Sequence, residues 1–130
     1  KIATWNINSI RAREGRLTQW LAQHRPDVLC LQEIKVEDAA FPTGVLTAAG
    51  YQVAVFGQRS YNGVAIASTA PLHDVARGRE AGQLDVTVLR CEHDTGIVLG
   101  AAAGSQPVLP RCTIQPRGWP VVLMSRRKNL

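Results

Sequence analysis

The sequence predicts an α/β protein, a partial α/β sandwich in a single domain, and two features of the chain lead to this class. Over residues 1–80, short apolar segments of strand length alternate with helical patterns in the order strand, helix, strand, helix, strand, strand. Residues 81–130 lack this order: Trp119 is their only aromatic residue, and four prolines fall between positions 107 and 120. Because proline interrupts helices and central strands, we expect this C-terminal part to be irregular.

The first strand and the first helix are expected within residues 2–26. Residues 2–7 are mostly apolar and end at a polar segment, which predicts a short buried strand. The helix that follows carries an inward face at helical spacing, formed by Leu17, Trp20, Leu21 and His24. Ser9 is suited to cap its start, and Pro26 closes it off.

A second helix and a hairpin are expected next. Residues 42–50 predict a short helix between a proline and a glycine, with Leu46 and Ala49 facing inward. Residues 51–56 and 63–67 are rich in strand-forming side chains, and the polar segment between them predicts the tip of a hairpin.

Polar side chains follow both of the first two strands. Residues 28–31 form the second apolar strand, and a helix joins it to the first, so the two strands are predicted to be parallel neighbours. Their carboxyl ends then lie side by side, and this edge is where open α/β sheets bind ligands. Asn6 and Asn8 would therefore lie close to Glu33.

Three segments stand out by their order and spacing: Trp5–Ala12, Leu31–Lys35 and Tyr61–Ala65. They resemble the motifs of the exonuclease III family of AP endonucleases, within the endonuclease/exonuclease/phosphatase superfamily. The resemblance covers about the first 80 residues, so we expect residues 1–80 to be the N-terminal part of a nuclease domain and residues 81–130 to be a divergent tail. It also implies the superfamily's two-sheet sandwich. We expect this chain to supply strands mainly for the first sheet, leaving apolar surface exposed on one face.

The resemblance implies that Glu33 and Asn6 bind a divalent metal ion, Mg²⁺ with Mn²⁺ as an alternative, and that Asn8 supports them. Mg²⁺ takes one or two protein carboxylates and keeps several waters, which suits a single glutamate beside an amide oxygen. A solvated acid at the start of a helix is the ordinary alternative for Glu33.

The resemblance also places four residues near bound DNA: Arg11, Lys35, Tyr61 and Asn62. Arg11 follows a strand end and opens a helix, which suits a phosphate contact. Solvent-facing side chains are the alternatives for Arg11 and Lys35. Asn62 precedes a glycine, as in any tight turn.

The sequence lacks the later residues that the family pattern requires. It has no Asp-x-Asn pair, no tyrosine after Tyr61 and no aspartate after Asp94. We therefore expect no catalytic residue in this chain and little or no activity. We expect the tail to result from a frameshift or a truncation, and a genuine short variant is the alternative.

The leading hypothesis is a DNA repair nuclease, a metal-dependent hydrolase of phosphodiester bonds in double-stranded DNA at abasic sites or 3′ ends. The alternative is a non-catalytic basic fragment that binds nucleic acid weakly, in line with a net charge of +5. A branch that hydrolyses phosphoinositides or sphingomyelin is a third hypothesis. Three cysteines without a CxxC pair favour the reducing cytoplasm, and no apolar run is long enough for a membrane span, so we expect a cytoplasmic protein that does not bind membranes. We expect the complete protein to be a monomer.

Overall fold

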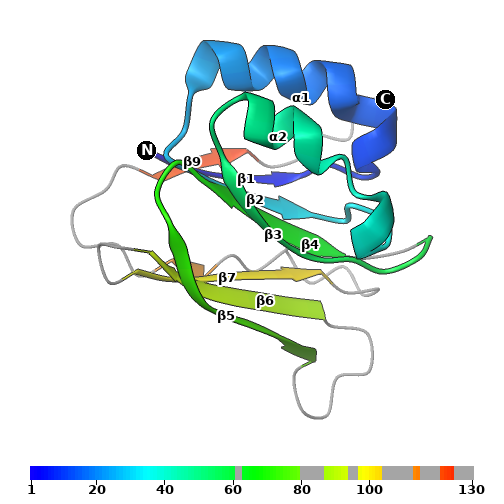
Figure 1. Ribbon diagram of the computed structural model, residues 1–130, viewed down its shortest axis with the longest axis vertical. Helices are drawn as coiled ribbons and strands as arrows, with labels where there is room; N and C mark the ends of the chain where they lie inside the picture. The colour runs from blue at the N-terminus through cyan, green and yellow to red at the C-terminus, as the bar shows by residue number, and fades with distance from the viewer. Residues whose placement is uncertain (61–62, 80–86, 94–96, 104–112, 115–120, 125–130) are drawn as a thin grey trace.

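The computed structural model describes residues 1–60, 63–79, 87–93, 97–103, 113–114 and 121–124, with side chains for 1–60, 63–73, 75 and 77. These residues form three layers, with two helices above a first sheet and a second sheet below it (Figure 1). The α/β sandwich expected from the sequence is confirmed.

The first sheet has five strands in the order β3-β4-β2-β1-β9. Their bounds are β1 Ile2–Asn6, β2 Val28–Gln32, β3 Gln52–Phe56, β4 Val64–Ser68 and β9 Val121–Met124. Strands β3 and β4 form the expected antiparallel hairpin. Strand β9 runs parallel to β1 and brings the end of the described chain back to its start.

Strands β1 and β2 are parallel neighbours, as predicted. Asn6 pairs with Gln32 in their register, so Glu33 follows directly after the partner of Asn6. This register places the polar residues that end both strands at one edge of the sheet.

Helix α1 (Ile10–His24) covers one face of the sheet. Ser9 caps it as expected, since its Oγ accepts a hydrogen bond from the Ala12 amide at 3.4 Å. Leu17 and Leu21 are buried on its inner side, whereas His24 is exposed.

A short 3-10 turn, η1 (Asp38–Ala40), leads to helix α2 (Thr43–Ala48). Leu46 is buried as predicted. The prediction for Ala49 is wrong: α2 ends one residue earlier, and Ala49 is exposed at its C-cap. No helix among the described residues is long and apolar enough to cross a bilayer.

The described part of the C-terminal region is more regular than expected. A second sheet has the order β5-β6-β7-β8, with bounds Leu72–Arg79, Thr87–His93, Ile97–Ala103 and Thr113–Ile114. None of these four strands contains a proline, in keeping with their regular pairing.

The second sheet covers the face of the first sheet that the helices leave open. Strands β6 and β7 lie against β4, and β5 and β6 lie against β3. Every residue of β2 and β4 is buried, so both faces of these strands are covered. The expectation of an exposed apolar face is therefore wrong, because the C-terminal strands form the missing layer.

Candidate metal centre

The carboxyl ends of β1 and β2 bring Asn6 and Glu33 together. Asn6 Nδ2 donates a hydrogen bond to Glu33 Oε1 at 2.9 Å. A carboxylate oxygen can only accept here, so the bond fixes which end of the Asn6 amide faces Glu33. The pair that the sequence predicts as metal ligands is in contact.

The other atom of the Asn6 amide fits a metal ion. Asn6 Oδ1 is buried and is the one such side-chain atom without a hydrogen-bond partner in the part of the chain that the structure describes. An unpartnered buried carbonyl oxygen costs about 1–3 kcal/mol, which a cation or a donor on a ligand would offset. Oxygen is also the ligand atom that Mg²⁺ and Mn²⁺ prefer.

The residues at this edge supply a single carboxylate. Within the described ranges, no group of three or more His, Cys, Asp or Glu side chains could hold a metal ion. One glutamate and one amide oxygen suit a cation that keeps most of its waters or takes further oxygens from a substrate, as Mg²⁺ does.

Lys35 and Asn8 belong to the same cluster. Lys35 Nζ donates to Asn8 Oδ1 at 2.6 Å and lies 3.8 Å from Glu33 Oε2. Asn8 therefore reaches Glu33 indirectly, through the ammonium group of Lys35.

Backbone hydrogen bonds hold the two strand ends in register beyond the sheet. The amides of Ile7, Ser9 and Ile10 donate to the carbonyls of residues 32, 33 and 34, at 3.0, 2.8 and 3.1 Å. Asn8, Glu33 and Lys35 have positive φ angles of 46°, 51° and 56°. Such a backbone costs about 1–3 kcal/mol per residue and is concentrated at functional sites, where it directs side chains.

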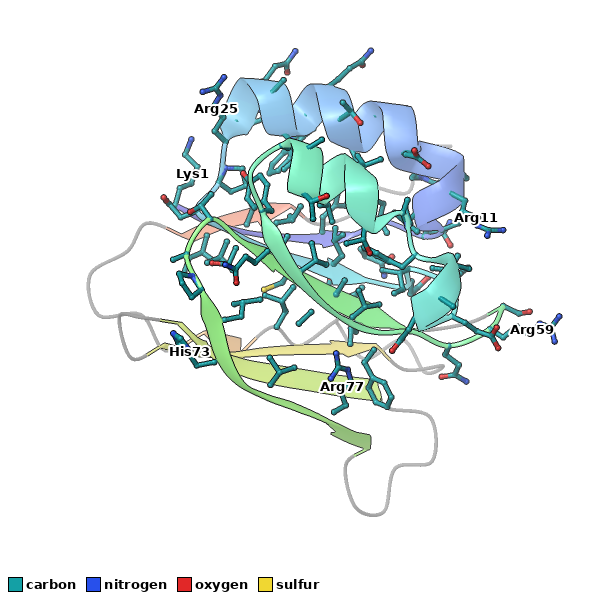
Figure 2. The ribbon with its side chains drawn as sticks, viewed as in Figure 1. Lys1, Arg11, Arg25, Arg59, His73 and Arg77 are labelled. Atoms are coloured by element: carbon teal, nitrogen blue, oxygen red, sulfur yellow. The ribbon has the colours of Figure 1, made fainter. Side chains whose placement is uncertain are left out.

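Of the other residues predicted to contact DNA, the structure describes only Arg11. Arg11 is exposed in the first turn of α1, and Figure 2 shows it on the same side of the molecule as Arg59, which is also exposed. Lys1 and Arg25 lie on the opposite side (Figure 2). The predictions for Tyr61 and Asn62 lie outside the described residues.

Two further residues shape the site and were not predicted. Arg13 Nη1 donates to the carbonyl oxygen of Asn8 and so supports the loop after β1. The carbonyl oxygen of Gly63 accepts a hydrogen bond from the Ile34 amide at 3.2 Å, which joins the hairpin to the loop after β2. The Asn-Gly pair at 62–63 was the available signal for Gly63; nothing in the sequence marks Arg13.

Sequence comparison relates this chain to known proteins. Residues 3–127 match the Endonuclease/Exonuclease/phosphatase family. An exodeoxyribonuclease III from Haemophilus influenzae is 40% identical over 78 residues, which are 60% of this chain and 29% of that relative. The chain thus spans less than a third of the length of this curated relative.

Solved structures are also similar to this chain. An AP endonuclease from Archaeoglobus fulgidus is 38% identical and superposes with a TM-score of 0.65 over 72% of this chain and 37% of the other. A 3′ phosphatase from Neisseria bound to a product DNA hairpin is 35% identical, with a TM-score of 0.68 over 76% of this chain and 39% of that one.

Proposed function

The chain belongs to the Endonuclease/Exonuclease/phosphatase family, and from this premise we propose that it carries the metal-binding half of a DNA repair nuclease. The proposed reaction is hydrolysis of phosphodiester bonds in double-stranded DNA at abasic sites or 3′ ends. The names of the similar proteins, an exodeoxyribonuclease III, an AP endonuclease and a 3′ phosphatase with a DNA product, support this substrate class.

The observation that carries the proposal is the contact between Asn6 and Glu33. Glu33 offers carboxylate oxygens and Asn6 an unpartnered buried amide oxygen at the edge where substrates of open α/β sheets bind. Bound Mg²⁺ or Mn²⁺ would polarise a phosphate oxygen and offset the charge that builds on the leaving oxygen.

Positively charged and polar side chains around this edge would position the DNA. Arg11 is proposed to contact a backbone phosphate, because it is exposed at the start of a helix that follows β1. Tyr61 and Asn62 are proposed to lie beside the DNA on the resemblance alone.

We expect the chain by itself to cleave DNA weakly or not at all. Its sequence has no Asp-x-Asn pair to activate or orient the attacking water and no later Asp-His pair to stabilise the charge of the transition state. Cleavage of an abasic duplex by the purified 130-residue chain at a rate typical of nucleases would contradict this expectation.

The metal site is tested by calorimetric titration with Mn²⁺ of the unchanged chain and of Glu33→Gln. Glu33→Gln removes the carboxylate charge and is expected to weaken binding at least tenfold. Glu37→Gln is the matched control, since Glu37 is exposed in the same loop and caps no helix with its side chain. Equal affinity in all three proteins would exclude Glu33 as a ligand.

A second candidate function is nucleic-acid binding without catalysis. The exposed Arg11 and Arg59 on one side of the molecule favour it, together with the net charge of +5. It predicts that duplex DNA binds in the presence of EDTA, with an affinity that falls steeply with salt and is unchanged in Glu33→Gln. Fluorescence anisotropy of a labelled duplex at several salt concentrations measures this.

A further inference from the structure

The ammonium group of Lys35 lies inside the candidate metal centre. Its Nζ is 2.6 Å from Asn8 Oδ1 and 3.8 Å from Glu33 Oε2. The side chains of Lys35 and Glu33 are each 30% exposed, so most of the surface of both is shielded from water.

The backbone keeps Lys35 in this place. Ile34, between Glu33 and Lys35, is fully buried and donates its amide to Gly63, which anchors the segment. Glu33 and Lys35 flank this anchored residue with positive φ angles, and their side chains contact Asn6 and Asn8, respectively.

Glu33 has two oxygens, and each already has a nitrogen nearby. Oε1 accepts a hydrogen bond from Asn6, and Oε2 faces the Lys35 ammonium. A divalent cation bound to Oε2 at about 2.1 Å would lie no more than roughly 6 Å from the Lys35 ammonium. The two positive charges repel each other at this distance even in water.

From this arrangement we propose that the ammonium group of Lys35 is the counter-ion of Glu33 and that its charge lowers the affinity of the site for divalent metal ions. The inference rests on the proposed function, because it assumes that Glu33 is a metal ligand. Its consequence is that metal binds weakly to the protein alone and more tightly when a DNA phosphate adds negative charge to the site.

The experiment is a calorimetric Mn²⁺ titration of the 130-residue chain in four forms: unchanged, Lys35→Gln, Lys35→Met and Arg16→Gln. Glutamine and methionine remove the charge at position 35 while keeping an unbranched side chain of similar length. Both are expected to tighten Mn²⁺ binding about tenfold, from the repulsion between a unit charge and a divalent cation roughly 6 Å apart in water.

Arg16→Gln is the matched control for net charge. Arg16 is exposed on α1, so the variant loses the same charge away from Glu33 and is expected to bind Mn²⁺ as the unchanged chain does. Circular dichroism confirms that each variant is folded, and the two substitutions at Lys35 guard against a local folding defect in one of them.

The result that would overturn the inference is an Mn²⁺ affinity that stays the same or falls in both Lys35 variants. A drop in DNA affinity in EDTA in the same variants, with a shallower salt dependence, would then assign Lys35 to a phosphate contact. Failure of the proposed function gives a different result, because Mn²⁺ binding would then be absent or insensitive to Glu33→Gln.

Discussion

Gly63 offers a sharp test of how the hairpin holds the candidate metal centre. This glycine has a φ angle of +79° and accepts the hydrogen bond from the Ile34 amide. A Cβ added to it would lie 2.8 Å from Ile34 Cγ1 and 3.1 Å from the Gln58 backbone nitrogen. Gly63→Ala therefore pushes against the buried residue that lies between Glu33 and Lys35.

The expected loss of stability has two parts. An alanine with left-handed backbone costs about 1–2 kcal/mol. Overpacking against a buried side chain adds about 1–3 kcal/mol. Ile34 is fully buried and cannot move aside freely, so we expect Gly63→Ala to lower the free energy of unfolding by about 2–5 kcal/mol.

Gly50 provides the matched control. It also has a positive φ, of +91°, but a Cβ there would meet nothing within 4 Å. Gly50→Ala should therefore cost only the backbone part, about 1–2 kcal/mol. Urea unfolding followed by circular dichroism measures both variants, and Mn²⁺ titration should show weaker binding only in Gly63→Ala.

Equal losses of stability in Gly63→Ala and Gly50→Ala would refute the reasoning. They would mean that Ile34 gives way at no cost and that the hairpin does not press on the loop after β2. An unchanged Mn²⁺ affinity in a destabilised Gly63→Ala would refute the link between the hairpin and the metal centre.

Two further predictions concern the same domain. Burial, with a smaller contribution from the charge of Asp27, raises the pKa of Tyr51 above its ordinary value of 10.0. The unfolded chain then loses this proton first, so the contribution of Tyr51 to stability should be constant below about pH 10 and fall as the pH rises beyond it. Tyr51→Phe also loses the 2.6 Å hydrogen bond to the Pro26 carbonyl, and its urea unfolding between about pH 8 and 11 should show a smaller fall in stability. Arg77 Nε donates to the Val55 carbonyl at 2.6 Å on the edge strand β3. Arg77→Ala should therefore lower the free energy of unfolding by about 1 kcal/mol and increase self-association, as measured by light scattering. Unchanged scattering would show that this guanidinium does not protect the edge.

The sequence was most informative where structure depends on neighbours in the chain. The apolar segments of β1 and β2 and the helical spacing of Leu17 and Leu21 predict the β1-α1-β2 unit, because the period of the buried residues within each segment reflects its own secondary structure. The parallel pairing follows from the intervening helix, and it was enough to place Asn6 near Glu33. Ser9 was recognisable as a cap from its position alone.

The rest depends on contacts between distant parts of the chain. The pairing of β9 with β1 joins opposite ends of the sequence, and no local pattern announces it. The second sheet was missed because β7 is rich in small residues and the surrounding prolines suggested irregular structure. At the site, the position of Lys35 depends on positive φ angles at residues other than glycine, which residue type does not predict.

The ladder of main-chain bonds between the loops after β1 and β2 has an evolutionary consequence. Main-chain groups are the same for almost every amino acid, so these hydrogen bonds do not depend on the side chains of Ser9 and Glu33, the two residues of the ladder whose side chains are not buried. A lineage can therefore exchange the side chains that meet a substrate while it inherits the frame that carries them. Selection on specificity and selection on architecture act here on different atoms of the same residues.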